Sequence, residues 1–156
     1  MVLLDIKSAF DSVWHNGLVF KMKRLNFPTE TIKIIQSFLC NRTFKVFIGS
    51  KCSQQITVTA GCPQGSCLSP ILYNVFTADI PSLTNCMTSI FADDTSILCS
   101  DLLSADIITS LQTALTHLNQ YFKKWNILIN PEKTQAIYFT RKRKPCFLPQ
   151  SFVIKC

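Results

Sequence analysis

Residues 87–100 read MTSIFADDTSILCS, and this stretch decides the fold that we expect. Two short runs rich in apolar and β-branched residues stand on either side of Asp93 and Asp94. Runs of this length that meet at polar residues are typical of a β-hairpin. A tight hairpin turn favours glycine because it needs a positive φ, and two adjacent aspartates repel each other. The sequence therefore predicts a hairpin whose tip carries two carboxylates for a reason other than turn stability.

Further strands and one long helix are expected on either side of this hairpin. Residues 1–6 (MVLLDI) predict a short buried strand with Asp5 near its end, and TQAIYFT (134–140) predicts another strand. From Ser104 onward, apolar residues recur at helical spacing, which predicts an amphipathic helix. These residues are Ile107, Ile108, Leu111, Leu115, Leu118, Phe122 and Trp125.

The middle of the chain alternates between helical and β-type patterns. It predicts helices at about 16–26 and 29–40, a hairpin made of 43–49 and 54–59, a Gly/Pro loop at 61–67, and a helix that Ser69 caps and that stops near Pro81. This order of elements predicts an α+β fold, with a small antiparallel sheet and helices packed on one face.

The chain is apolar for its size. Of its 156 residues, 47% are hydrophobic and 16% are charged, and the mean hydropathy is +0.23. No apolar run approaches the roughly 20 residues that cross a bilayer, and the N-terminus shows no secretory signal pattern. A large core would explain this composition, but we favour a piece of a larger protein whose apolar faces pack on other segments.

The eight cysteines do not form a recognisable metal-binding pattern. There is no CxxC pair, and the closest two, Cys62 and Cys67, have no histidine nearby to complete a zinc site. Several lie in apolar surroundings, as buried thiols do. We therefore expect reduced cysteines and an intracellular compartment.

The net charge of +7 is unevenly distributed along the chain. Residues 1–60 hold eight Lys/Arg against three Asp/Glu, and residues 121–156 hold eight against one. Residues 61–120 hold no Lys or Arg and five Asp. Basic flanks attract a polyanion and an acidic centre can hold cations, although such runs are also typical of an ordinary solvated surface.

Three carboxylates are candidate metal ligands: Asp5, Asp93 and Asp94. Carboxylates on apolar scaffolding are costly unless a cation joins them, and Asp93 and Asp94 have no Lys or Arg near them in the sequence. Hard oxygen ligands favour Mg²⁺ or Mn²⁺, and two such ions about 3.5–4 Å apart serve in-line phosphoryl displacement. Taken alone, an Asp-Asp pair is more often a solvated turn.

Four segments, in this order and spacing, resemble the motifs of reverse transcriptases. LLDIKSAFDSV (3–13) resembles motif A, AGCPQGSCLSPILYNVFTADIP (60–81) motif B, FADDTSIL (91–98) motif C, and the helix from 104 with LINPEKTQAIYF (128–139) motif D. NRTFKVFIG and FTADIP resemble jockey-type elements of the non-LTR (LINE) retrotransposons in particular. The resemblance covers the chain to about residue 140.

The resemblance implies a two-metal site for nucleotidyl transfer. Asp5, Asp93 and Asp94 would be catalytic and would hold two Mg²⁺ (or Mn²⁺) ions, and the backbone carbonyl of Ile6 would add a ligand. Lys133 would be the motif D lysine, which gives a proton to the leaving pyrophosphate.

Three further residues would bind the substrate. Phe10 matches the bulky gate that excludes a 2′-hydroxyl and so selects deoxynucleotides. Gln64 would touch the incoming nucleotide and the template, and Gly65 suits a place where backbone approaches a ligand closely. Outside such motifs, Phe10 would be taken as a core residue and Gln64 and Lys133 as ordinary loop residues.

The resemblance also implies a domain organisation and partners. Residues 1–140 would form the palm core of the polymerase with a partial fingers-like insertion, and residues 141–156 a basic tail or the start of the next hairpin. By the same resemblance, the N-terminal part of the fingers and the thumb would lie outside this sequence. The implied partners are an RNA template, a DNA primer and a deoxynucleoside triphosphate (dNTP), with no membrane, in the nucleus and cytoplasm.

Two other functions stay open. A truncated, catalytically inactive remnant would at most bind nucleic acid through its basic flanks. A metal-dependent phosphohydrolase is disfavoured by the motifs around Phe10 and Gln64. Because fingers and thumb segments are missing, we expect the isolated chain to extend a primer little or not at all.

Overall fold

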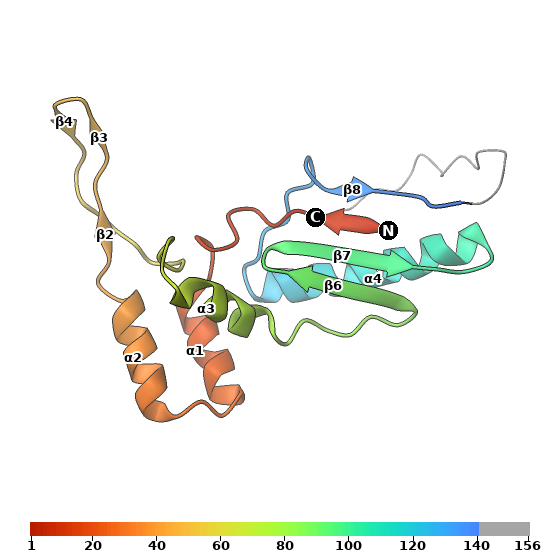
Figure 1. Cartoon of the computed structure of the whole chain (residues 1–156), viewed down its shortest axis with the longest axis horizontal. Coiled ribbons are helices and arrows are strands. Elements are labelled where there is room, and N and C mark those ends of the chain that lie inside the picture. Colours follow the sequence, from red (N-terminus) through yellow and green to blue (C-terminus); the bar gives the residue numbers. More distant parts are fainter. Residues whose placement is uncertain (141–156) are drawn as a thin grey trace. The chain divides into compact units, whose positions relative to one another are not determined.

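The computed structural model describes residues 1–140 and divides the chain into two compact units. Among the described residues, the first unit contains Met1–Lys7 and residues 80–140, and the second contains Ser8–Asp79. Figure 1 shows the helices and strands of both units. The expected basic tail, 141–156, lies outside the described residues.

An antiparallel sheet forms the centre of the first unit (Figure 1). Its strands are β6 (Cys86–Phe91), β7 (Asp94–Cys99), β1 (Val2–Leu4) and β8 (Gln135–Ala136), in the order β6-β7-β1-β8. Among the described residues of this unit, α4 (Ser104–Lys124) is the helix that packs against the sheet. The predicted hairpin, leading strand and amphipathic helix are confirmed, and the α+β class with them.

Alternation of side chains explains why one face of this sheet is buried. In β7, Thr95, Ile97 and Cys99 are buried, and the residues between them are not, which is the period of two expected of a strand. Fully burying an aliphatic or aromatic side chain contributes roughly 1.5–3 kcal/mol, so this face supplies the core of the unit. On α4 the buried side chains follow helical spacing: Leu111, Ala114, Leu115, Leu118, Tyr121 and Phe122.

The turn of the β6–β7 hairpin lies one residue earlier than the sequence indicates. Phe91 pairs with Asp94, so the turn residues are Ala92 and Asp93, and Asp94 begins β7. Ala92 has a φ of 53° and so takes the positive φ that a tight hairpin turn needs. The expectation that Asp93 and Asp94 together form the tip is therefore wrong by one residue.

The second unit contains helices close to the predicted ranges. α1 (His15–Arg24) and α2 (Thr29–Leu39) agree with the sequence, and α3 (Leu68–Thr77) follows the Gly/Pro loop. The prediction that Ser69 caps this helix is wrong: Ser69 lies in its first turn, and its hydroxyl donates to the carbonyl of Pro63 at 2.5 Å. None of the described helices in either unit has both the length and the apolar character of a membrane span.

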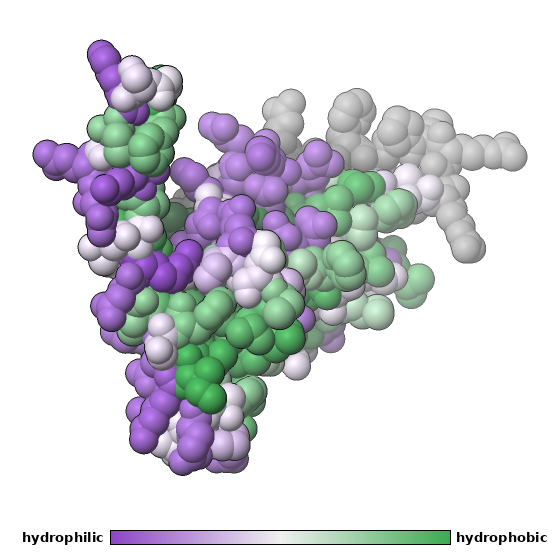
Figure 2. Space-filling model, turned by 60° about the vertical axis from the view of Figure 1, so that its left-hand side comes forward, coloured by the Kyte–Doolittle hydropathy of each residue, from purple (hydrophilic) through white to green (hydrophobic). Residues whose placement is uncertain are grey.

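A β-ribbon replaces the simple hairpin predicted at 43–59. β2 (Thr43–Phe44) pairs with β5 (Ile56–Thr57), and β3 (Phe47–Ile48) pairs with β4 (Lys51–Cys52). The register shifts by one residue between the two pairings, which is the signature of a bulge. The ribbon leaves apolar side chains in solvent, with Phe47 70% and Ile48 77% exposed. Hydrophobic atoms are visible between hydrophilic ones on this arm in Figure 2.

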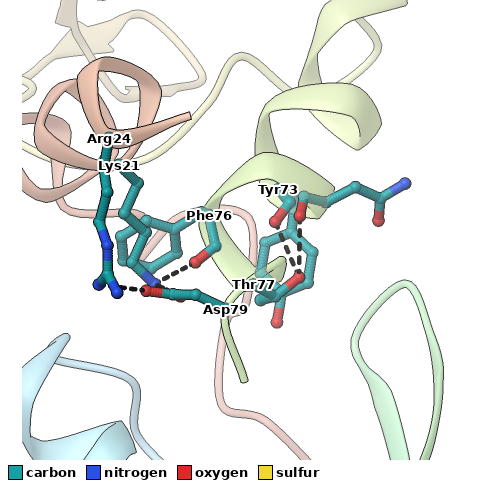
Figure 3. A network of polar contacts seen from close by, with 7 residues as sticks. Lys21, Arg24, Tyr73, Phe76, Thr77 and Asp79 are labelled. Carbon is teal, nitrogen blue, oxygen red and sulfur yellow. Dashed lines mark hydrogen bonds and ion pairs between the residues drawn. The ribbon is translucent and has the colours of Figure 1, made fainter. Parts of the chain in front are cut away.

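A buried ammonium group joins α1 to α3 (Figure 3). Lys21 is only 2% exposed, and its Nζ donates to Asp79 Oδ1 at 2.6 Å and to the Phe76 carbonyl at 2.5 Å. The same Nζ lies 4.7 Å from the centre of the Phe76 ring. A buried charge is costly unless it is paired and hydrogen-bonded, and Lys21 meets both conditions. Arg24 adds a longer contact to Asp79 at 3.8 Å.

The cysteines differ from the expectation that all would be reduced. Cys86 and Cys99 form a disulfide across the open end of the β6–β7 hairpin. The register sets these residues directly opposite each other, with a Cα–Cα distance of 4.4 Å. Their separation of 13 residues reveals this pairing only once the hairpin register is known. Cys40, Cys52, Cys62 and Cys67 are free.

Candidate active site

The β1–β7 ladder brings two of the predicted carboxylates to one end of the sheet. Leu4 pairs with Thr95, and continuing the ladder by one residue sets Asp5 opposite Asp94. Leu4 and Thr95 are both buried, so the side chains of Asp5 and Asp94 belong to the opposite, open face. Asp93 follows at the turn of the hairpin. All three predicted acidic residues thus lie at the same end of the first unit.

No protein group neutralises these carboxylates in the described part of the chain. Within residues 1–140, the side chains of Asp5, Asp93 and Asp94 make no ion pair and no hydrogen bond. Like charges on directly opposite residues of two strands are destabilising. A cation at this end of the sheet would remove that repulsion.

The described residues do not, however, form a closed cage for a cation. Among them, no group of three or more His, Cys, Asp or Glu side chains could by itself hold a metal ion. Asp5, Asp93 and Asp94 therefore do not make up such a group by themselves. The oxygen chemistry nevertheless fits Mg²⁺, which is usually held by one or two carboxylates and keeps several water molecules.

A hollow next to Asp94 leaves room for a ligand. It measures about 270 Å³ and opens on the sheet face that carries Asp94. Its lining mixes serine hydroxyls with apolar side chains: Leu3, Leu4, Ser89, Phe91, Asp94, Thr95 and Ser96. Asp94 is the one carboxylate in this lining, and it adds a charged group to a hollow whose other walls are apolar side chains and hydroxyls, the usual mixture of a ligand site.

The backbone carbonyl of Ile6 faces the hairpin side of β1. Ile6 pairs with Ile129, and the bonds of this pair run from Lys7 N–H to the Leu128 carbonyl and from Asn130 N–H to the Asp5 carbonyl, both at 2.8 Å. In an antiparallel ladder this pattern turns the N–H and C=O of Ile6 away from Ile129. Since β7 lies on that other side of β1, the Ile6 carbonyl is directed toward the end of the sheet where Asp93 lies.

Lys133 lies on an excursion of the chain that opens beside Asp5. Leu3 pairs with Gln135, whereas Ile6 pairs with Ile129, so three residues are left over between the two pairings. They are residues 131–133, which leave the ladder as a turn. Extra residues in a strand re-aim side chains next to functional sites. Lys133 is exposed at the end of this turn, in the same unit as the three carboxylates.

In the second unit, Gln64 is held by Asp11. The Gln64 Nε2 donates to both carboxylate oxygens of Asp11, at 2.9 and 3.0 Å. An ionised carboxylate only accepts hydrogen bonds, so the amide nitrogen must face Asp11. Gly65 follows with a φ of +82° and no atom within 4 Å of where a Cβ would stand. Glycine is favoured at position 65 because of this positive φ and not because of crowding, since the space beside it is open.

Phe10 is half-buried and contacts the ring of Tyr73, with 5.1 Å between the ring centroids. The carbonyl of Phe10 accepts a hydrogen bond from the Cys62 N–H at 2.8 Å. This bond ties the segment of Phe10 and Asp11 to the loop of Gln64 and Gly65. The three predicted substrate-binding residues are therefore brought together within the second unit.

Gly61 is a residue whose importance the sequence did not reveal. Its φ is +87°, and a Cβ would stand 2.6 Å from the carbonyl oxygen of Asp11. Its own carbonyl accepts hydrogen bonds from His15 Nε2 at 2.8 Å and Arg42 Nη1 at 3.0 Å. Gly61 thereby allows the two segments to touch. A lone glycine in a Gly/Pro loop gives no hint of such a contact.

The thiol next to Gly61 is unsuited to nucleophilic catalysis. Cys62 is buried, and burial raises the pKa of its thiol to about 11, although the nearby charge of Arg42 acts in the opposite direction. The thiolate is the reactive form of cysteine, so Cys62 stays protonated and inert near neutral pH.

Comparison with known proteins identifies the family. The family model described as reverse transcriptase (RNA-dependent DNA polymerase) matches residues 1–150. The RNA-directed DNA polymerase from the mobile element jockey of Drosophila melanogaster is 38% identical over 151 residues, which is 92% of this chain. A probable RNA-directed DNA polymerase from transposon BS of the same species is 38% identical over 149 residues, 90% of this chain. The chain spans 16% of the length of either relative.

The fold is also similar to a solved structure. Apo telomerase from Candida tropicalis, truncated from its C-terminal domain, matches with a TM-score of 0.65 and 16% identity, over 92% of this chain and 31% of that one. At this identity the likeness concerns the fold alone. The family match over nearly the whole sequence, however, confirms the resemblance expected from the four motifs. The chain belongs to the reverse transcriptase family of RNA-dependent DNA polymerases.

Proposed function

We propose that this chain carries the palm, with its nucleotidyl-transfer centre, of an RNA-directed DNA polymerase from a jockey-type non-LTR retrotransposon. The observation that supports this most is the β1–β7 register, which pairs Leu4 with Thr95 and, continued by one residue, sets Asp5 opposite Asp94, with Asp93 at the adjoining turn. The relatives named RNA-directed DNA polymerases agree with it. The second unit would then be the fingers-like insertion.

The proposed cation site uses oxygen ligands from two segments. Asp5, Asp93 and Asp94 would hold Mg²⁺, and the Ile6 carbonyl, which faces the same end of the sheet, would add a ligand. Bound there, such ions would neutralise charge on the reacting phosphate. The chain's own task is to keep these oxygens on a rigid sheet end, because phosphoryl transfer depends mainly on positioning and charge stabilisation.

The other predicted residues would bind the substrate or assist the departure of pyrophosphate. Phe10 would exclude a 2′-hydroxyl, and Gln64 and Gly65 would contact the incoming dNTP opposite its RNA template. Because Asp11 holds the Gln64 Nε2, the amide oxygen is left to accept a hydrogen bond from the substrate. Lys133 would protonate the leaving pyrophosphate from its exposed turn.

The test is primer extension with Mg²⁺ on poly(rA)/oligo(dT), by the longest protein that contains these residues. The unaltered protein should extend the primer, and Asp93→Ala should reduce synthesis at least about a hundredfold while RNA binding is retained. Asp101→Asn is the matched control, because Asp101 is an exposed carboxylate of the same unit away from the hairpin tip.

Undiminished synthesis by Asp93→Ala would remove Asp93 from the centre. If the unaltered protein binds RNA but never extends a primer, the inactive remnant is the better account of this chain.

A further inference from the structure

Thr134 occupies an unusual place in the ladder beside Asp5. In an unbroken ladder, Asp5 and Asn130 would exchange two backbone hydrogen bonds. One is present, from the Asn130 N–H to the Asp5 carbonyl at 2.8 Å. The other is replaced, because the Asp5 N–H donates to Thr134 Oγ1 at 3.4 Å. This hydroxyl in turn donates to the Asn130 carbonyl at 2.8 Å, so it is inserted between two backbone groups of the ladder.

The same hydroxyl closes the base of the turn that carries Lys133. The Thr134 N–H also donates to the Asn130 carbonyl, at 3.1 Å, so both ends of the excursion 131–133 meet at one carbonyl. Without the hydroxyl, the N–H of half-buried Asp5 would lose its acceptor, and the turn would keep one bond instead of two. An N–H left unsatisfied on burial is costly, so the backbone of Asp5 would shift or open to water.

We propose that Thr134 is a positioning residue that holds Asp5 and the Lys133 turn together as one unit. It acts through the backbone from which the Asp5 carboxylate and the Lys133 ammonium project. This inference rests on the proposed function, which gives both groups a task at one centre. A threonine that only stabilised the sheet would leave the affinity for a cation at Asp5 unchanged.

The experiment compares Thr134→Val, which removes the hydroxyl, with Thr134→Ser, which keeps it. The control is Thr113→Val, because the Thr113 hydroxyl also donates to the carbonyl four residues earlier, at 2.9 Å, but on the exposed side of α4. Two measurements are made on the whole chain: hydrogen exchange of the Asp5 amide by NMR, and Mn²⁺ affinity by electron paramagnetic resonance, with Asp93→Ala as the reference for site loss.

We expect Thr134→Val to speed exchange at Asp5 and to weaken Mn²⁺ binding on the order of tenfold, as outer-shell substitutions at metal sites do. Thr134→Ser and Thr113→Val should stay within about twofold of the unaltered chain. Unchanged exchange and affinity in Thr134→Val would overturn the inference. If Thr134→Val does not fold, the test uses Thr134→Ser, which keeps the hydroxyl and should keep the Mn²⁺ affinity. A tenfold loss of Mn²⁺ affinity in Thr134→Ser would also overturn the inference.

Failure of the proposed function has a different signature. In that case the unaltered chain binds Mn²⁺ no better than Asp93→Ala does. Hydrogen exchange at Asp5 then still tests the contact between Thr134 and the Asp5 backbone, because that measurement needs no cation.

Discussion

At the scale of single residues, the close contact between Gly61 and Asp11 matters most for the second unit. The Gly61 N–H donates to the Val13 carbonyl at 2.9 Å, and the Gly61 carbonyl accepts from His15 and Arg42. These bonds hold the loop against the Asp11 backbone and so bring Gln64 within reach of the Asp11 carboxylate. The orientation of one amide therefore depends on a glycine three residues away.

We expect Gly61→Ala to lower the free energy of unfolding by about 2–4 kcal/mol, since it adds positive-φ strain to a clash with backbone. Gly49→Ala is the matched control: Gly49 also has a positive φ, +60°, but nothing lies within 4 Å of its Cβ position. That control should cost only about 1 kcal/mol. Urea unfolding followed by circular dichroism measures both, and equal losses would show that the contact with Asp11 is unimportant.

Residue-scale features divide according to whether local sequence encodes them. The acidic pair is visible in the sequence, because two adjacent aspartates are unfavourable in a tight hairpin turn. The position of the turn is not visible, since Ala92 takes the positive φ although the sequence places the tip at Asp93 and Asp94. Gly61 is hidden as well, because the backbone that it touches is 50 positions away in the chain.

At the scale of elements, the contact between α1 and α3 depends on one buried charge. The Asp79 side chain is 28% exposed and that of Lys21 only 2%, so the two partners are not equivalent. Removal of Asp79 leaves a buried ammonium with weaker compensation, whereas replacement of Lys21 by an apolar side chain of similar length removes the buried charge itself.

The two substitutions should therefore differ in their effect on stability. Asp79→Ala should lower the free energy of unfolding by about 2–4 kcal/mol, and Lys21→Met by clearly less. Arg24→Met, which removes the exposed 3.8 Å contact, should change it by no more than about 0.5 kcal/mol. Urea denaturation ranks the three variants. If Lys21→Met lowered the free energy of unfolding more than the other two substitutions, the prediction would be wrong, and the ion pair itself would stabilise the contact between α1 and α3.

Local patterns predict most elements but not how they join. The periodicity from Ser104 gives α4 almost residue by residue, because its apolar stripe faces the sheet. The strand predicted at 134–140 shortens to Gln135–Ala136, since only those residues pair with β1 within the strand. The disulfide and the Lys21–Asp79 pair were not foreseen, because both join residues that are distant in sequence until the fold places them together.

At the scale of the whole molecule, the charge of the sequence is unevenly distributed. Asp93 and Asp94 of the candidate centre fall in the stretch 61–120, which has no Lys or Arg, whereas Asp5 lies near the N-terminus, and the basic residues lie on both sides of that stretch in the chain. Lys45 and Lys51 are exposed on the ribbon, and no acidic residue occurs between Glu30 and Asp79. Under the proposed function, these basic segments would contact the phosphates of nucleic acid.

Binding of the chain to single-stranded RNA should therefore weaken as salt rises. In a double-logarithmic plot of affinity against salt, the slope should be about −0.7 for each phosphate that the chain neutralises. Lys45→Gln with Lys51→Gln should make the slope shallower, and Asp93→Ala should leave it unchanged. Fluorescence anisotropy over a salt series measures the RNA affinity, and so the slope, of the unaltered chain and of each variant. If the slope is the same with and without the two lysine substitutions, the ribbon does not contact the RNA phosphates.

The excursion at 131–133 has a consequence for how this site can vary. Its two flanking pairings, Ile6 with Ile129 and Leu3 with Gln135, would merge into one continuous ladder if those three residues were absent. The inserted turn can therefore grow, shrink or change its composition without moving any residue of β1. Natural or designed variation of residues 131–133 can thus change the side chain that lies beside Asp5 while the aspartates keep their positions on the sheet.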